Sequence, residues 1–484
     1  MSRGTAAAGR ARNGMALLAI AAAGAALLRI AIAARIPLVE DEAYYWVWAR
    51  HLAWGYPDHP PMIAALIALG TRLLGDGVIA IRILPVLLGS ATPLLLYLAG
   101  RDLFNPPAGR RAALLFLVIP ISALGLAFAF PDAPLGLFWA LSLWSGWRAL
   151  RAGGWWWVVA GIAVAMARLS KFTAVFLVAG LAVMWATGPW RRSLRDPGWY
   201  AGLAIGLFLI LPTLWWNASH GWWVVRMVWE RPPWIVPRSV PENLLYFLGG
   251  QLLYHGPLAL LLVGGMVVAL RRVRDPAWRY LACMSAPIMA ATFALALGAQ
   301  AKPHWSSPAY LTGLIALGTL WPDWRRRRPA LVSAAAALTA LITVAATGAV
   351  LLPVGVAVED TFGRWDRVAE AVYREAAARE AFILTSSYQS ASEIIYHARP
   401  PMPVTTPIAA FLLWQSPGDL AGRNVLYVDD RGDRGGNPVQ SLANVCRNVQ
   451  LVRAVPLTPQ QVVTLYGCSD FRGSFGDSPV PGSP

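Results

Sequence analysis

Long apolar runs alternate with short polar connections over roughly the first 350 residues of the chain. A membrane-spanning helix needs about 20 consecutive apolar residues. The runs predict about eleven spans, at 14–34, 78–99, 112–130, 132–150, 155–169, 172–188, 199–216, 244–270, 279–298, 304–321 and 329–353. The fifth and sixth runs are short and nearly adjacent, which is typical of a coupled or re-entrant pair. We therefore expect an all-α polytopic membrane domain over residues 1–353.

The pattern changes after Pro353, where shorter apolar segments alternate with helical periodicity. The predicted elements are a helix over 363–380, a strand at 382–384, a short helix from Ser390 and a strand at 425–428. This alternation predicts a small α/β domain outside the membrane over residues 354–472. Residues 473–484 are rich in Gly, Ser and Pro, which is typical of a disordered tail.

The composition agrees with a membrane protein and argues against a nucleic-acid partner. The chain is 57% hydrophobic and only 14% charged, whereas soluble domains carry about a quarter charged residues. Its net charge of +16 would fit nucleic-acid binding if the basic residues formed one patch. Instead, the arginines stand in short connections between apolar runs, which indicates membrane topology.

The distribution of arginine sets the expected orientation. Arginines are frequent in the N-terminal segment 3–12 and in the connection after every second span, at 101–111, 148–151, 191–195, 271–279 and 325–328. The positive-inside bias places these connections and the N-terminus in the cytoplasm, and the C-terminal domain outside a plasma (inner) membrane. The first run could instead be a signal peptide, but it is long for one and contains Arg29. Cys446 and Cys468 would then face an oxidising compartment, either bridged or as two buried thiols.

With this topology, candidate functional side chains gather at the outer face. They are Asp41, Glu42, Asp58, His59, Asp132, Lys171, Lys302 and His304, with Arg82 and Arg168 near outer span ends. Only two of the 41 basic residues are lysines, and both lie at this face. A compact ammonium there suits a phosphate group.

Each candidate also has a structural interpretation. Asp41 and Glu42 could cap a helix that begins at Ala43, and Asp58 could be a turn residue. Arg82 and Arg168 could extend to lipid headgroups, with phosphate binding as the second interpretation. Three consecutive acids at residues 40–42 exceed what a cap requires, so the acidic pair is assigned to function.

Several of these segments resemble glycosyltransferase family 39 and its bacterial relatives, which modify lipid A and lipopolysaccharide. The first outer loop carries the resemblance in Asp-Glu-Ala-Tyr-Tyr-Trp at 41–46 and Tyr-Pro-Asp-His-Pro-Pro-Met at 56–62. Further similar segments are Pro-Asp-Ala-Pro at 131–134, Ser-Lys-Phe-Thr at 170–173, Ala-Lys-Pro-His-Trp at 301–305 and 387–393 in the soluble domain. The resemblance implies a GT-C fold, a polyprenyl-phosphate sugar donor, a catalytic acid/base at Asp41 and a second acid at Asp132. His59 stands where the aminoarabinose transferases carry a lysine, which argues against aminoarabinose as the sugar.

The residues and the resemblance together predict a membrane glycosyltransferase that transfers a sugar to an envelope glycolipid, glycan or protein. Asp41 would take the acceptor proton, with Glu42 and Asp132 as further catalytic carboxylates. The lysines and arginines would balance the carrier phosphate, with Asp58, His59 and His304 among the substrate-binding residues. No cofactor is required, although a divalent metal is compatible with the acids and histidines. A transporter or lipid flippase is the alternative, but it should keep ionisable residues in mid-span; a lipid-binding scaffold is a second alternative.

Overall fold

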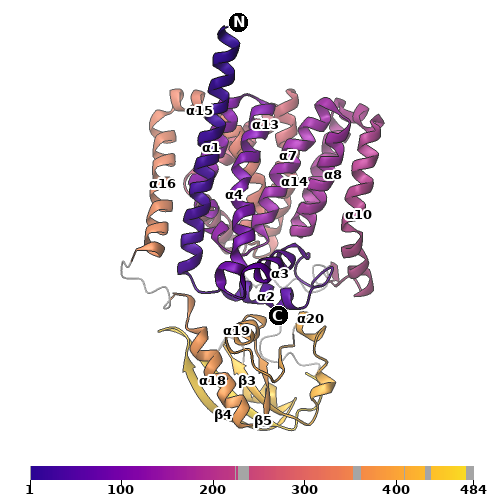
Figure 1. Ribbon diagram of the computed structural model, residues 1–484, viewed down its shortest axis with the longest axis vertical. Coiled ribbons are helices and arrows are strands. Elements are labelled where there is room, and N and C mark those ends of the chain that lie inside the picture. The colour runs from indigo at the N-terminus through magenta and orange to yellow at the C-terminus, as the bar shows by residue number, and fades with distance from the viewer. Residues whose placement is uncertain are drawn as a thin grey trace.

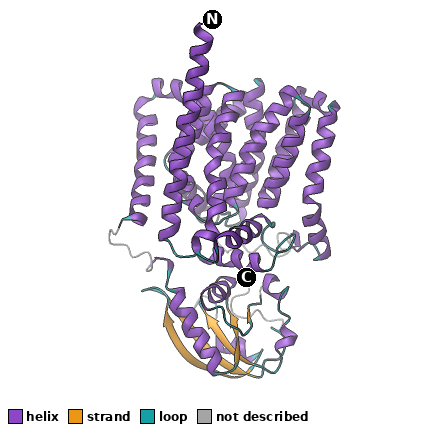
Figure 2. Cartoon of the chain, viewed as in Figure 1, coloured by secondary structure: helices purple, strands orange, loops and turns teal. Residues whose placement is uncertain are grey.

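The protein consists of a helical bundle with a smaller α/β domain at one end (Figure 1). The structure, a computed structural model, describes residues 2–223, 225–226, 239–352, 361–407, 409–430 and 438–475. The N-terminus and the α/β domain lie at opposite ends of the bundle. Strands occur only in the α/β domain among the described residues (Figure 2). The predicted class, a helical membrane domain followed by a small α/β domain, is confirmed.

A helix lies at each of the eleven predicted segments. The bundle helices are α1 (Ser2–Arg35), α4 (Val78–Leu103), α5 (Pro106–Val118), α7 (Asp132–Ala152), α8 (Trp155–Ser170), α9 (Val175–Thr187), α10 (Pro197–Ser219), α12 (Val240–His255), α13 (Leu258–Arg271), α14 (Pro276–Gly298), α15 (Ser307–Arg327) and α16 (Pro329–Leu351). Of the described helices, 5 are long and apolar enough to cross a membrane alone, and up to 7 spans result if each bent pair counts as one.

Two runs that read as continuous in the sequence are bent. The segment after α5, Pro120–Ala127, turns by 74°, and α13 turns by 103° from α12. Pro120 lacks the backbone N–H that would continue α5, and it holds Ile119 in extended backbone. Gly256 takes a φ of 65° at the second bend, just before Pro257, a conformation that glycine adopts without steric cost. Straight spans over 112–130 and 244–270 are therefore wrong.

Two short helices lie between the bundle and the α/β domain. They are α2 (Glu40–Arg50) and α3 (Met62–Leu74), and both lie at the end of the bundle that faces this domain (Figure 1). The aromatic residues of α2 are buried in a cluster with Ala391 and Phe411 of the α/β domain. The α/β domain thus packs directly against α2.

The α/β domain contains one five-stranded sheet. Its elements are α18 (Trp365–Ala378), β1 (Ala381–Thr385), α19 (Tyr388–Ala398), β2 (Val404–Thr405), α20 (Ala409–Leu412), β3 (Asn424–Asp429), α21 (Pro438–Ala443), β4 (Arg447–Pro456) and β5 (Val462–Ser469). The strand order is β2-β1-β3-β5-β4, with β1 parallel to both neighbours and β5 antiparallel to both of its own.

Four elements of this domain match the four expected from the sequence, whereas β4 and β5 were not foreseen. A disulfide joins Cys446 to Cys468, so the bridged alternative holds. The predicted boundary after Pro353 falls in residues 353–360, outside the described part of the chain. The predicted disordered tail lies outside it as well beyond residue 475.

Candidate active site

Asp41 lies in the first turn of α2, where the chain leaves the bundle. Val39 precedes the helix in extended backbone, and its N–H donates to the Glu42 carboxylate at 3.2 Å, which closes this turn. The Asp41 carboxylate is partly exposed and accepts a hydrogen bond from the Tyr388 hydroxyl of α19 at 3.3 Å. Burial raises the pKa of Asp41, while Lys302 and the Tyr388 hydrogen bond partly offset that rise. Asp41 thus has the environment of a carboxylate whose affinity for a proton is increased.

Asp58 lies beside this centre in the loop between α2 and α3. It accepts a hydrogen bond from the Tyr44 hydroxyl at 2.8 Å. The Tyr44 ring lies 4.3 Å from the ring of Tyr388, so one aromatic pair supports both acids. Burial raises the pKa of Asp58, and the charge of Asp41 raises it further. The two carboxylates are therefore close enough to oppose each other's ionisation.

Asp132, at the first residue of α7, forms an ion pair with Lys171. The Lys171 ammonium donates to both carboxylate oxygens, at 2.8 Å and 2.9 Å, and its side chain is only 6% exposed. His59 and His304 interact electrostatically with this pair. Burial, and then the charge of Lys171, lowers the pKa of His59 to about 3. His59 is therefore neutral at physiological pH and offers hydrogen bonds rather than a charge.

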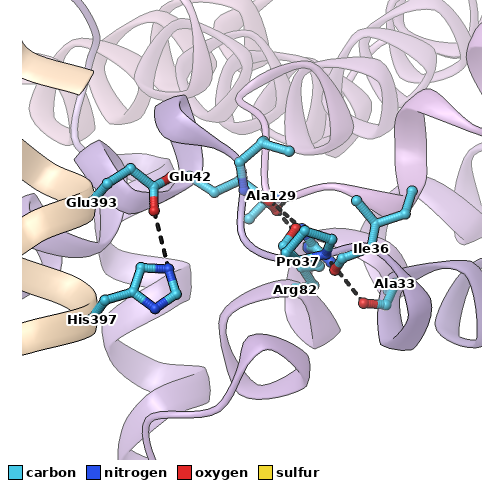
Figure 3. A network of polar contacts seen from close by, with 9 residues as sticks. Ala33, Ile36, Pro37, Glu42, Arg82, Ala129, Glu393 and His397 are labelled. Atoms are coloured by element: carbon cyan, nitrogen blue, oxygen red, sulfur yellow. Dashed lines mark hydrogen bonds and ion pairs between the residues drawn. The ribbon is translucent and has the colours of Figure 1, made fainter. Parts of the chain in front are cut away.

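Glu42 forms a buried ion pair with Arg82 of α4 (Figure 3). Every N–H of the Arg82 guanidinium has an acceptor in Glu42 or in the carbonyls of Ala33, Ile36 and Pro37. Glu42 also accepts from the N–H of Ala129 at 2.7 Å. Both residues were expected to act on substrate. Their hydrogen-bonding groups instead hold together the end of α1, α2, α4 and the loop before α7.

The remaining candidate cations have different surroundings. Lys302 is exposed, and its ammonium forms no ion pair with a described residue, but its charge acts on Asp41, Asp58 and His59. Arg168 lies near the end of α8, with its guanidinium 4.5 Å above the ring of Phe172. No described contact connects Arg168 to the acids. Within the described ranges, no group of three or more His, Cys, Asp or Glu residues is arranged to hold a metal ion.

Two tyrosines at this site were not among the expected residues. Tyr388 lies in the segment 387–393 that carried the resemblance, but its contact with Asp41 spans 347 positions. Tyr44 is three residues after Asp41 on the same helix. That spacing puts both residues on one face of α2, so the sequence alone could have indicated that Tyr44 lies near Asp41.

Comparison with known proteins supports the resemblance. Residues 58–216 match the family described as dolichyl-phosphate-mannose-protein mannosyltransferase. A lipid A galacturonosyltransferase of Rhizobium johnstonii is 28% identical over 74% of this chain and 77% of its own length. An undecaprenyl phosphate-α-4-amino-4-deoxy-L-arabinose arabinosyl transferase of Pseudomonas aeruginosa is 32% identical, but the match covers 36% of this chain and 33% of that protein.

The fold is similar to that of solved membrane enzymes. ArnT of Cupriavidus metallidurans in its apo state superposes with a TM-score of 0.67 and 15% identity, over 93% of this chain and 98% of that chain. An oligosaccharyltransferase of Archaeoglobus fulgidus gives a TM-score of 0.55 over 85% of this chain and 68% of that chain, also at 15% identity. The chain is therefore an integral membrane protein with a GT-C fold, and the relatives that it matches are sugar transferases.

Proposed function

We propose that this enzyme transfers a sugar from a polyprenyl-phosphate carrier to an envelope glycolipid, with lipid A as the first candidate acceptor. The relatives named above are lipid A and undecaprenyl-phosphate sugar transferases, and ArnT has a related structure with bound undecaprenyl phosphate. The observation that carries the proposal is the grouping of Asp41, Asp58 and Lys302 around one end of the bundle. A glycan or protein acceptor would use the same centre.

Asp41 is the proposed general base. Its carboxylate takes the proton of an acceptor hydroxyl while the hydroxyl oxygen forms a bond to the anomeric carbon of the donor sugar. The bond between that carbon and the phosphate oxygen breaks, and polyprenyl phosphate leaves with the electron pair. This single displacement inverts the anomeric centre. The raised pKa of Asp41 makes it a stronger base than an ordinary aspartate.

Lys302 is the proposed partner of the carrier phosphate. Its charge is not consumed by an ion pair with a described residue, whereas Lys171 is neutralised by Asp132. A cation in this place stabilises the charge that develops on the leaving phosphate. The Asp132–Lys171 pair, with His59 and His304 beside it, would orient the donor by hydrogen bonds. Arg168 would interact with lipid headgroups and not with the carrier phosphate.

Glu42 and Arg82 have a positioning role in this proposal. Their side chains are buried and fully occupied with each other and with backbone groups. They keep the Asp41 turn and the loop before Asp132 at a fixed separation. This supports Asp41 and Asp132, rather than Glu42, as the acids that act at the reaction centre.

The site is proposed to face the extracytoplasmic side of the plasma (inner) membrane, with the N-terminus in the cytoplasm. The support is the positive-inside bias and the position of the N-terminus at the end of the bundle opposite the α/β domain. Cysteines introduced at Trp54 and at Arg453, both exposed, should react with a membrane-impermeant thiol reagent in intact spheroplasts. Labelling only after lysis would reverse the orientation.

A transfer assay tests the reaction itself. The purified protein is incubated with polyprenyl-phosphate-linked galacturonic acid or aminoarabinose and with lipid A, and sugar incorporation is followed by mass spectrometry. We expect transfer from one donor and release of polyprenyl phosphate in equal amount. Lipid analysis of a deletion strain provides the second readout, because the donor should accumulate as the envelope glycolipid loses one sugar. An unchanged envelope and the absence of transfer from every donor would refute the proposal.

A further inference from the structure

An open cavity of about 450 Å³ lies between the helical bundle and the α/β domain, on the other side of α2 from Asp41. It is lined by Trp46, Arg50, Asp76, Ile395, Arg399, Pro400, Met402 and Val404. Helix geometry turns the chain by about 100° per residue, so Arg50 projects from α2 roughly opposite to Asp41. The cavity is thus separate from the proposed reaction centre but shares a helix with it.

The charges of this cavity are not balanced. Asp76, in the turn between α3 and α4, bridges the guanidinium groups of Arg50 and Arg399 with its two carboxylate oxygens. One carboxylate against two guanidiniums leaves a net charge of +1. The two arginine side chains are 43% and 56% exposed, so their remaining N–H groups are accessible from the cavity. Paired guanidiniums of this kind suit the oxygens of a phosphate.

Two further features indicate a binding site. One is the ring of Trp46, which is only 4% exposed. Both guanidiniums lie against its ring, at 4.7 Å for Arg50 and 5.8 Å for Arg399. Arg399 also adopts a left-handed backbone with a φ of 45° at the end of α19, where glycine or asparagine is preferred. The chain therefore keeps an arginine beside Trp46 in a backbone conformation that disfavours it.

The position of the cavity points to its ligand. Helix α2 follows α1 directly and lies at the level where the bundle meets the α/β domain (Figure 1). Because α2 lines the cavity, the cavity lies just beyond the end of a span. A ligand with acyl chains in the membrane would present its phosphate at this level. Apolar Ile395, Met402 and Val404 on the remaining wall can cover the uncharged part of a headgroup.

We propose that this cavity binds the phosphate of the anionic glycolipid acceptor and so holds the acceptor next to the reaction centre. The identification of the ligand as the acceptor rests on the proposed function, but binding of a phosphate-bearing lipid in the cavity does not require sugar transfer. Arg50 and Arg399 hold the phosphate oxygens, the Trp46 ring supports both guanidiniums, and Asp76 keeps the arginines in place when the site is free. Asp76 also competes with the ligand for both guanidiniums.

This competition gives a test that a structural role cannot imitate. Arg50→Gln and Arg399→Gln each remove one ion pair of Asp76, and Asp76→Asn removes both. If the pairs are only structural, all three variants should lose stability and none should gain affinity for lipid A. If the cavity binds phosphate, the arginine variants should lose affinity for lipid A by about tenfold or more, and Asp76→Asn should gain several-fold, because its cavity carries a charge of +2. Arg374→Gln, an exposed arginine of α18 paired with Glu370, is the matched control.

Binding of lipid A and of its dephosphorylated form to the purified full-length protein is measured by native mass spectrometry in detergent, independently of sugar transfer. We expect wild-type protein and the control to prefer the phosphorylated form, and the arginine variants to lose the preference. Loss of lipid A binding in Asp76→Asn, or an unchanged preference in both arginine variants, would overturn the site. Equal competition by millimolar inorganic phosphate would assign the cavity to free phosphate and overturn the acceptor role. Phosphate-dependent binding without any transfer would refute the proposed function and leave the site intact.

Discussion

The carboxylate of Glu42 and the guanidinium of Arg82 form an ion pair with side-chain exposures of 0% and 1%. The same carboxylate accepts from the N–H of Ala129, three residues before Asp132, and Arg82 donates to the carbonyls of Ala33, in the last turn of α1, and of Ile36, just after α1. Because Asp41 directly precedes Glu42 and Ala129 lies close before Asp132, this pair fixes the position of Asp41 relative to Asp132. We therefore expect removal of this ion pair to destabilise the fold, with loss of sugar transfer as a consequence.

Arg82→Met should unfold at a lower temperature and lose transfer together with the fold. Removing one partner leaves the charge of Glu42 buried without compensation, which costs about 3–5 kcal/mol. Thermal unfolding of the purified protein in detergent measures the change. The double variant with Glu42→Gln should recover part of the loss, because no buried charge remains. A wild-type melting temperature for Arg82→Met would contradict the positioning role, and Arg374→Gln at the exposed pair with Glu370 is the control.

Asp41→Asn should abolish transfer and keep the wild-type melting temperature. The amide retains the size of the side chain but cannot accept the acceptor proton. In the wild-type enzyme the base must be ionised, so activity should fall as the pH falls through the pKa of Asp41, which burial raises. The acid limb of the pH profile of kcat/KM should then begin above the pH expected for an exposed aspartate. Full turnover by a folded Asp41→Asn protein would mean that Asp58 or Asp132 is the general base.

The two lysines should respond differently to removal of their charge. Lys302→Met should reduce use of the polyprenyl-phosphate donor by about tenfold or more without lowering stability, because Lys302 is exposed. Lys302→Arg should keep part of the activity, since the charge remains. Lys171→Met should lower both stability and transfer, because it leaves Asp132 without its ion-pair partner. Steady-state kinetics with varied donor concentration, together with thermal unfolding, separate the two cases. An unchanged dependence on donor concentration in Lys302→Met would show that Lys302 does not bind the carrier phosphate.

Stability at the junction of the two domains should decrease as the pH rises. Burial, and then the charges of Glu393, Asp430 and Asp41, raises the pKa of Glu40 to about 7. Burial raises the pKa of Glu393 to about 6. A carboxyl group whose pKa is higher in the folded state favours folding when protonated. This stabilisation is complete below the unfolded pKa of about 4.5 and is lost as the pH rises through about 6 and 7.

Melting temperatures measured across this pH range should fall in the wild-type protein and vary less in Glu40→Gln. The exposed Glu370→Gln should retain the wild-type dependence. A steeper dependence in Glu40→Gln would contradict the assignment of the effect to this carboxyl group.

Removal of the disulfide should destabilise the α/β domain specifically. Cys446 and Cys468 are 22 positions apart, and closing a loop of this length contributes about 3 kcal/mol in the chain-entropy model. The double variant Cys446→Ser/Cys468→Ser should expose β4 and β5 to hydrogen exchange while the bundle keeps its protection. Mass mapping under non-reducing conditions should find the bridged peptide; two free thiols would contradict the structure.

The sequence alone determined that the chain is a membrane protein with a separate C-terminal α/β domain. Apolar runs of span length and arginines in alternate connections follow from the thickness and asymmetry of the bilayer, which act on local sequence. The same pattern brought Asp41, Asp58, Asp132, Lys171 and Lys302 to one face. It could not predict the bends, since apolar composition continues through both of them.

Only the tertiary structure decided which side chains act together. Asp41 and Glu42 are neighbours in the sequence, but successive residues of a helix point about 100° apart, so one faces Tyr388 and the other Arg82. Lys171 and Lys302 looked equivalent until Asp132 was found to neutralise the first. The contact between Tyr388 and Asp41, like the cavity between Trp46 and Arg399, joins segments more than 340 residues apart. Such contacts arise from the docking of the α/β domain on α2, because packing between distant segments leaves no periodic signal in the sequence.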